Sequence, residues 1–204
     1  AVLHKDMKVW LTGIERSHSI TFDVHKWLSV PMGASMFITR NPEILHKTFR
    51  VTADYMPKDA KDLQIIDPFT HSIQWSRRCS GLKLYLSLLM FGYKGYAEVI
   101  EHQTNVGTAL KKLLEANGWV IKNQTPLPIA CFTDTELETD TRFVTSICDA
   151  IVKSGKAWIS VYPINSINTL RACITNYATS MEDIAVLVKL LNEKREEYRK
   201  VEQL

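Results

Sequence analysis

The chain has 204 residues, of which 46% are hydrophobic and 23% are charged, and its formal net charge is +3. These values are ordinary for a globular protein with one large domain or parts of two. Lysine and arginine gather only in the last predicted helix, where they alternate with glutamate, so we expect no nucleic-acid partner. No run of residues reaches the ~18 apolar positions that a membrane span needs, so we expect no membrane partner.

The cysteines predict buried, reduced thiols rather than a disulfide framework or a metal site. They are scattered among apolar neighbours, and no two form a Cys-x-x-Cys pair. The six histidines also lack the spacing of metal ligands. These features fit a reducing compartment, and we expect a cytoplasmic protein without a metal ion. The four cysteines are Cys79, Cys131, Cys148 and Cys173.

The first part of the chain predicts short elements around a loop. Residues 5–15 have the pattern of a helix end, and apolar strands are expected at 18–23 and 33–39. A short helix should run from Pro42 to Phe49, because proline favours the first turn of a helix. The two strands therefore flank a loop that has no regular period of its own.

The middle of the chain predicts a second, longer loop and two helices. Residues 51–70 show neither helical nor strand period, which is typical of a loop that is either functional or disordered. A long helix is expected over 72–91, and its nearly all-apolar C-terminal half predicts burial. Gly92 and Gly95 should interrupt it before a second helix over 95–116, which carries a single apolar stripe.

The last part of the chain mixes strands and helices. A helix over 141–154 has a capping residue at Asp140 or Thr141, and a final helix opens with a capping-box pattern from Thr179 to Glu182. The final helix should turn an apolar face inward and end in a solvated charged face over residues 193–202. The strands are expected at 119–123, 127–133, 157–162 and 168–175, and the inward residues are Ile184, Leu187, Val188 and Leu191.

Lys26 directly follows His25 near the end of the first predicted strand, in the run SITFDVHKWL. A lysine amine can condense with an aldehyde and anchor a cofactor if it is neutral part of the time, which a partly desolvated position allows. Ile20, Phe22 and Trp27 would supply apolar surroundings. On residue types alone, an edge strand followed by a surface lysine is the commoner arrangement, so both interpretations stay open.

The order of the motifs resembles the group II pyridoxal-phosphate (PLP) decarboxylases, which include the aromatic-L-amino-acid and glutamate decarboxylases. Their lysine motif contains His-Lys-Trp between two short strands, as His25, Lys26 and Trp27 stand here. The resemblance spans essentially the whole chain, in the family's order. It is carried by residues 18–27, 31–38, 74–78, 82–85, 92–95 and 170–174.

The resemblance implies an α/β fold of fold-type I, similar to aspartate aminotransferase. Residues 1–82 would form the end of the large PLP-binding domain, and residues 83–204 an α+β C-terminal small domain. The family works as a homodimer with active sites near the subunit interface. The family's Asp-Ala-Ala/Thr segment is not found before Ala1. The resemblance therefore implies a missing N-terminal half of the same protein, and we expect this fragment alone to be inactive.

The resemblance also assigns roles to four residues. Lys26 would carry PLP, and His25 would contact the PLP phosphate or orient the loop. Asp23 matches a position near the phosphate that is Asn in several relatives, so its role should involve backbone groups or His25. Tyr55 matches a tyrosine on a mobile loop that returns a proton to Cα after CO2 has left. The expected sites are thus Lys26 and Tyr55 for catalysis, and Lys26, His25 and Asp23 for cofactor binding.

The expected reaction is PLP-dependent decarboxylation of an L-amino acid to its amine and CO2. Ser76 favours an aromatic substrate of the phenolic kind, because plant aromatic decarboxylases tend to carry Ser there for phenolic and Gly for indole substrates. One alternative is decarboxylation coupled to oxidative deamination, although such relatives tend to carry Phe where Tyr55 stands. A pseudoenzyme or interaction subunit of the same fold is the other alternative.

Overall fold

The computed structural model describes residues 1–51 and 67–202. It divides into two compact units. The lysine unit is Leu11–Gly92, and the sheet unit is Ala1–Trp10 together with Tyr93–Leu204. The division follows Gly92, whose backbone (φ 61, ψ −176) is not helical. The assignment of residues 1–82 and 83–204 to a large and a small domain stays a prediction.

Two short 3-10 turns stand where the sequence predicted a helix over residues 5–15, so that prediction is wrong. They are η1 (Lys8–Leu11) and η2 (Ile14–Arg16). Gly13 between them adopts a left-handed conformation with φ 97, which a continuous α-helix excludes. Its N–H is bonded to the carboxylate of Glu15, 3.0 Å away, rather than to a helical carbonyl.

The two predicted strands of the lysine unit are present and pair with each other. Strand β1 (Ser19–Phe22) runs antiparallel to β2 (Met36–Thr39), and the last pair before the loop is Phe22 with Met36. The predicted short helix is confirmed as α1 (Pro42–Phe49), with proline in its first turn. The first element after residue 66 is the 3-10 turn η3 (Pro68–Thr70).

Helix α2 (Ser80–Ala116) begins later than residue 72, where the sequence predicted a start. The preceding segment uses side-chain bonds instead: the Ser72 hydroxyl lies within 3.0 Å of the Pro68 carbonyl and 3.2 Å of the Gln74 carbonyl. Such local bonds compete with helix formation. Gly92 interrupts α2 as predicted, whereas Gly95 remains helical.

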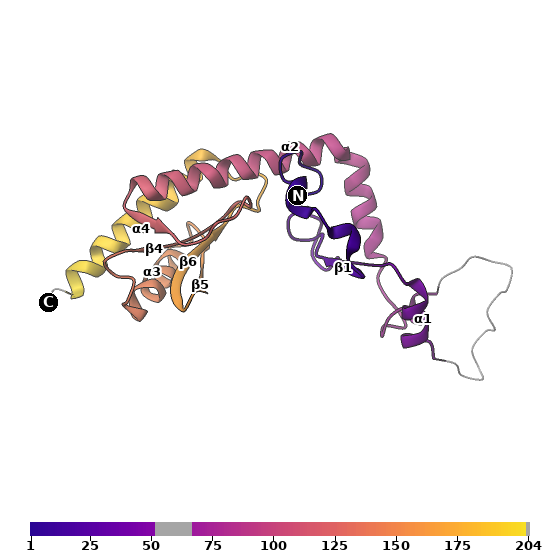
Figure 1. The fold of residues 1–204 in the computed structure, drawn as a ribbon. Helices are drawn as coiled ribbons and strands as arrows, with labels where there is room; N and C mark the ends of the chain where they lie inside the picture. The colour runs from indigo at the N-terminus through magenta and orange to yellow at the C-terminus, as the bar shows by residue number, and fades with distance from the viewer. Residues whose placement is uncertain (52–66, 203–204) are drawn as a thin grey trace. The chain divides into compact units, whose positions relative to one another are not determined.

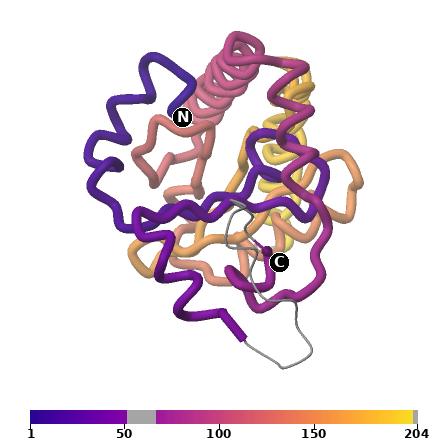
Figure 2. Tube along the Cα trace, turned by 90° about the vertical axis from the view of Figure 1, so that its right-hand side faces the viewer, coloured from indigo at the N-terminus to yellow at the C-terminus, as the bar shows by residue number. Residues whose placement is uncertain are grey.

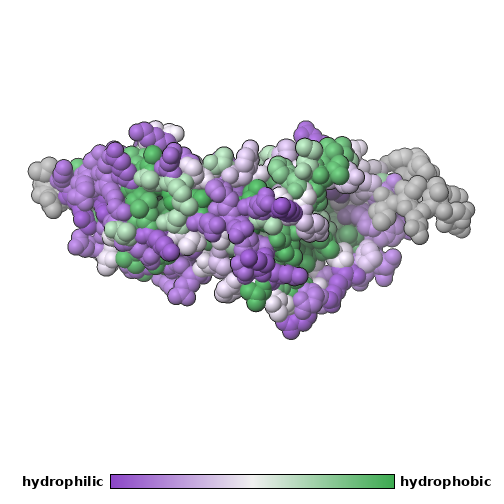
Figure 3. Space-filling model, turned by 90° about the horizontal axis from the view of Figure 1, so that it is seen from above, coloured by the Kyte–Doolittle hydropathy of each residue, from purple (hydrophilic) through white to green (hydrophobic). Residues whose placement is uncertain are grey.

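The apolar stretch over residues 82–91, at the start of α2, was predicted to be buried, and it is largely exposed. Met90 keeps 81% of its surface and Leu89 keeps 67%. Helical periodicity alone cannot show whether another layer covers an apolar helix. Hydrophobic residues at the surface appear in green in Figure 3. The exposed apolar residues on this stretch are Leu82, Tyr85, Leu86, Leu88, Leu89, Met90 and Phe91.

The sheet unit contains the predicted α+β arrangement (Figure 1). Its four strands form an antiparallel sheet in the order β3-β4-β6-β5. One core joins the sheet to the helices through Phe132, Leu170, Ile147, Leu191 and Leu110. The strands are β3 (Trp119–Ile121), β4 (Ile129–Asp134), β5 (Ser160–Ile164) and β6 (Ile167–Cys173), and the helices are α3 (Thr141–Lys153) and α4 (Met181–Glu202).

Helix α3 has the N-terminal cap and the apolar face that the sequence predicted. Its cap is Asp140, as predicted, because the carboxylate accepts the Arg142 backbone N–H at 2.9 Å. Tyr198 donates its hydroxyl to the same carboxylate, and these bonds hold the pKa of Asp140 below its usual value. The buried residues recur on one face, at Phe143, Val144, Ile147, Cys148 and Ile151.

The predicted inward face of α4 is confirmed, whereas the predictions for its two ends need correction. The four predicted inward residues are all buried. The capping box is formed by Ser180 and Asp183, one residue later than predicted. The charged tail is not merely solvated, because Arg195 and Arg199 both reach Asp134 on β4, at 3.2 and 3.0 Å. In Figure 2, α4 (yellow) runs beside the C-terminal part of α2.

The thiols are all free, but the prediction that all four are buried is wrong. Cys79, just before α2, is exposed, and Cys173 is half-buried. Cys131 and Cys148 are buried, and burial raises the pKa of both thiols. Over residues 1–51 and 67–202, no helix is long and apolar enough to cross a membrane.

Candidate active site: the Lys26 loop

The loop that carries Lys26 is folded on a small core of its own. The Lys26 N–H bonds to the Asp23 carbonyl at 3.1 Å, and the Ser29 N–H bonds to the Lys26 carbonyl at the same distance. Ser29 adopts a left-handed conformation with φ 54, which turns the chain back. The loop is therefore a defined support for Lys26. Its core consists of Val24, Val30 and Ala34, against which Leu28, Met36 and Leu84 pack.

The Lys26 side chain points away from this core. Its side chain is 69% exposed, and its Nζ lies 2.6 Å from Oδ2 of Asp23. The described residues thus supply an ion pair where the sequence predicted an apolar surrounding for the amine. The amine is accessible to a reagent or cofactor, and it is paired with the neighbouring carboxylate.

His25 is fixed by one carbonyl oxygen on the far side of the loop. Its Nδ1 lies 2.7 Å from the oxygen of Ala34, and its backbone N–H reaches the same oxygen at 3.2 Å. Because a carbonyl oxygen only accepts hydrogen bonds, Nδ1 carries the proton. The second ring nitrogen, Nε2, is then the acceptor of the neutral ring. The bond holds the imidazole next to Lys26 in the chain, with its tautomer defined.

Asp23 uses both carboxylate oxygens within the loop. Oδ2 pairs with Lys26, and Oδ1 accepts the hydroxyl of Ser35 at 2.5 Å. The hydrogen bond from Lys26, then that from Ser35, holds the pKa of Asp23 below its usual value; the charges of Lys26 and His25 act in the same direction. Asp23 is therefore a carboxylate at neutral pH.

Sequence reasoning missed Ser35 and Ala34 as parts of this site. Both lie in the 31–38 stretch that carries the family resemblance, but Ala34 acts only through its backbone carbonyl, and no motif singles out the Ser35 hydroxyl. Ser35 follows directly from the strand register, since Phe22 pairs with Met36 and Asp23 and Ser35 are the next residues inward. Cross-strand neighbours at the loop end of a hairpin are close enough to bond.

Tyr55 lies outside the described residues. The chain on either side of it is described, and α1 contacts η3 there. The rings of His46 and His71 lie 5.9 Å apart, and Arg50 lies 3.1 Å from His46. The His46–His71 contact thus joins α1 to the end of η3. The placement of Tyr55 against Lys26 stays a prediction.

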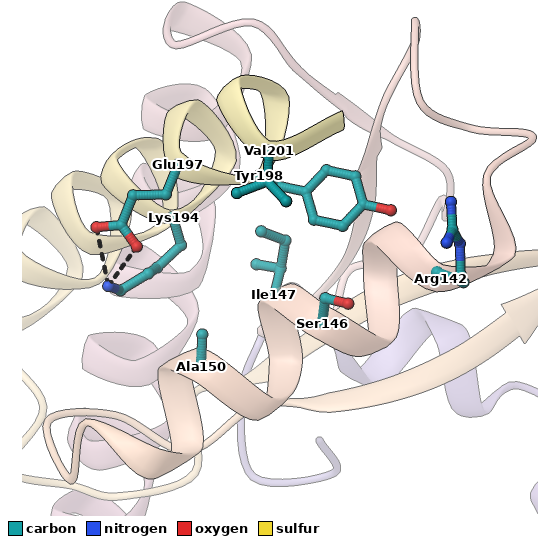
Figure 4. Close-up of a pocket in the computed structure, with 8 residues that line it drawn as sticks. All are labelled: Arg142, Ser146, Ile147, Ala150, Lys194, Glu197, Tyr198 and Val201. Atoms are coloured by element: carbon teal, nitrogen blue, oxygen red, sulfur yellow. Dashed lines mark hydrogen bonds and ion pairs between the residues drawn. The ribbon is translucent and has the colours of Figure 1, made fainter. Parts of the chain in front are cut away.

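A separate groove lies between α3 and α4 in the sheet unit (Figure 4). Its volume is about 380 Å³, and Lys194 and Glu197 form an ion pair at its edge. Among the described site residues, Asp23, His25 and Lys26 do not line it. The groove therefore does not locate the predicted chemistry. Its lining is Arg142, Ser146, Ile147, Ala150, Lys194, Glu197, Tyr198 and Val201.

Comparison with known proteins identifies the family to which this loop belongs. The family profile described as the pyridoxal-dependent decarboxylase conserved domain matches residues 1–134, which include the whole Lys26 loop. The chain belongs to the pyridoxal-dependent decarboxylase family. The predicted group II decarboxylase family and its cofactor class, pyridoxal phosphate, are thereby confirmed.

Two curated relatives extend the likeness beyond the profile. The chain is 27% identical over 208 residues to an aromatic-L-amino-acid decarboxylase of Bacillus atrophaeus, covering 97% of this chain and 42% of the relative. It is 22% identical over 187 residues to a phenylacetaldehyde synthase of a Rosa hybrid cultivar, covering 85% of this chain and 37% of the relative. The chain thus spans less than half the length of these decarboxylase relatives.

Solved structures support the predicted fold class. The chain resembles Oryza sativa TDC, solved with PLP and tryptamine, with a TM-score of 0.85 and 18% identity. The match covers 96% of this chain and 42% of that one. Since the described structure is also mixed α/β, the predicted α/β fold-type I class is confirmed.

The side chains of the loop fit pyridoxal phosphate at its aldehyde end. The donor there is a primary amine, which is the group that condenses with an aldehyde, and it projects from a loop with a packed base. Asp23 does not suit the phosphate end, because its carboxylate would repel a phosphate dianion. The prediction that Asp23 binds the cofactor remains untested.

Proposed function

We propose that the complete protein is a PLP-dependent decarboxylase of an L-amino acid, with Lys26 as the residue that carries the cofactor. The observation behind the proposal is the folded loop that presents Lys26 beside His25, in a chain of the decarboxylase family. The direct test is release of CO2 from L-amino acids by the full-length protein with PLP. An absence of CO2 release from every amino acid tried, with PLP bound, would favour the pseudoenzyme alternative.

The residues of the loop have separate tasks in this proposal. When bound, the cofactor supplies an electron-withdrawing ring that accepts the electron pair released as the carboxylate leaves. Lys26 Nζ binds it covalently and displaces the amine product at the end of the reaction. The Nδ1–H of His25 donates to the Ala34 carbonyl oxygen. The other ring nitrogen, Nε2, is therefore left to contact the phosphate or a reacting group. The buried valines beneath the loop orient both side chains.

Tyr55 is proposed to return a proton to the substrate Cα. We expect Tyr55→Phe to keep covalent cofactor binding but to slow amine release, because the phenol is the proton donor. Dioxygen then competes for the electron-rich Cα, so the carbonyl by-product should increase. Chromatography of amine and carbonyl products, with CO2 release as the common measure, checks this. An unchanged amine yield would remove Tyr55 from the mechanism.

Oxidative deamination coupled to decarboxylation is the second candidate, and the likeness to the Rosa phenylacetaldehyde synthase favours keeping it. The product of the unaltered protein distinguishes the two. An amine as the main product supports the decarboxylase proposal, whereas an aldehyde with consumption of dioxygen supports the alternative.

The proposed substrate is an aromatic amino acid of the phenolic kind. Ser76 is exposed in the segment between η3 and α2, and its side chain would occupy space that a bicyclic ring needs. We expect tyrosine or DOPA to be preferred over tryptophan. Ser76→Gly should then raise kcat/KM for tryptophan relative to tyrosine by roughly tenfold. A tryptophan preference already present with Ser76 would refute the steric argument, and glutamate serves as the non-aromatic comparison.

Assembly and location are proposed with the activity. We propose a cytoplasmic homodimer in which a further, N-terminal part of the same protein completes each active site. The exposed apolar residues over 82–91 of α2, together with Phe37 and Ile38 on β2, are surfaces that another layer would cover. Light scattering of the full-length protein tests the dimer.

A further inference from the structure

The carboxylate of Asp23 is held at both oxygens by residues of its own loop. Ser35 Oγ donates to Oδ1 at 2.5 Å, and Lys26 Nζ lies 2.6 Å from Oδ2. The pairing of Phe22 with Met36 fixes the distance between Asp23 and Ser35, since these two residues continue the register of β1 and β2. The position of the carboxylate is therefore set by the hairpin rather than by the flexible lysine.

A restrained carboxylate makes a better ion-pair partner than a free one. Exposed ion pairs are usually weak, partly because two flexible side chains must be ordered. Here the bond from Ser35 already orders one of them. The Asp23 side chain is 31% exposed, against 69% for Lys26, so the carboxylate is also the better shielded partner.

The pair bears directly on how Lys26 reacts. An ammonium has no lone pair, so it must lose a proton before it can attack a carbonyl carbon. As the carbon–nitrogen double bond forms, the nitrogen gives up three protons in all. Two leave with the carbonyl oxygen as water, and one goes to solvent. A carboxylate that stabilises the ammonium therefore slows this condensation.

We propose that Asp23, restrained by Ser35, is a positioning residue that holds the Lys26 ammonium at the loop and restrains its capture of carbonyl compounds. This inference rests on the proposed function of Lys26. Cofactor loading would then require the Asp23–Lys26 pair to separate.

Competitive acetylation of the cofactor-free, full-length protein tests the pair. Acetic anhydride is uncharged, so a change of local charge does not alter its approach. Peptide mass spectrometry gives the initial rate at Lys26 relative to Lys189, which is exposed on α4. Asp23→Asn should raise this relative rate by about two- to fivefold, the range that corresponds to an exposed ion pair. Asp23→Glu should restore a rate near that of the unaltered protein.

Two further variants separate positioning from a general loss of structure. Ser35→Ala removes the restraint but keeps the charge, so it should raise the Lys26 rate by a smaller factor than Asp23→Asn. Glu98→Gln removes the partner of Lys94, whose Nζ lies 3.9 Å away, and should leave Lys26 unchanged. The proposal would be overturned if neither Asp23→Asn nor Ser35→Ala raises the acetylation rate of Lys26 while the variants keep the Tm of the unaltered protein.

Borohydride trapping with PLP distinguishes this inference from the proposed function. If acetylation of Lys26 responds to Asp23→Asn while the trapped cofactor lies on another lysine, the ion-pair inference stands and the cofactor assignment fails. If the cofactor lies on Lys26 and its acetylation rate does not respond, the inference about Asp23 fails alone.

Discussion

Lys26→Ala is expected to abolish turnover of the full-length protein without unfolding it. The amine is the group that the proposed reaction requires, and alanine has no replacement for it. The Lys26 side chain is mostly exposed and the packed base of its loop is formed by other residues, so the substitution should change the free energy of unfolding by about 0.5 kcal/mol or less. CO2 release and the Tm are the two measurements.

Lys189→Ala is the matched control for this prediction. Lys189 is also an exposed lysine near a glutamate, with its Nζ 4.0 Å from Glu193. The control should retain both CO2 release and the Tm. Turnover by Lys26→Ala at a rate comparable to that of Lys189→Ala would contradict the role assigned to Lys26.

Asp134→Ala is expected to destabilise the sheet unit by about 3–5 kcal/mol, because it leaves a buried positive charge without its partner. The Asp134 side chain at the end of β4 is only 4% exposed and that of Arg195 only 11%. Arg195 also lies over the ring of Trp119, 4.6 Å from its centroid, and bonds to the Asn117 carbonyl at 2.8 Å. The guanidinium therefore cannot move to water without losing these contacts.

Glu136→Ala is the control for the buried pair, since Glu136 shares the partner Arg199 with Asp134. Its side chain is 79% exposed, so its loss should cost at most about 1 kcal/mol. Urea denaturation of the full-length variants, followed by tryptophan fluorescence, compares the two. Equal effects of Asp134→Ala and Glu136→Ala would refute the argument from burial.

Much of the sheet unit could be predicted because its elements have strong local signals. The apolar face of α3 recurs at helical spacing, Asp140 caps it, and Gly155 follows its end. The inward face of α4 was also identified correctly, at Ile184, Leu187 and Leu191. These signals lie within one element, so a sequence reveals them without knowledge of the partner.

The features that escaped prediction depend on partners far away in the sequence. The charged end of α4 was expected to be solvated, yet Arg195 meets a strand residue 61 positions earlier. The contact between Ser35 and Asp23 depends on the hairpin register, which the sequence does not state. The start of α2 was misplaced because the Ser72 hydroxyl bonds locally before the helix. Lys26 itself was found from a motif, and its ion pair was not.

The central proposal is that PLP is bound covalently to Lys26. Borohydride reduction of the full-length, PLP-loaded protein, followed by peptide mapping, measures this directly. We predict a single pyridoxyl-lysine in the peptide that contains His25, Lys26 and Trp27, and no stoichiometric label in Lys26→Ala. A stoichiometric label on any other lysine of the unaltered protein would contradict the proposal.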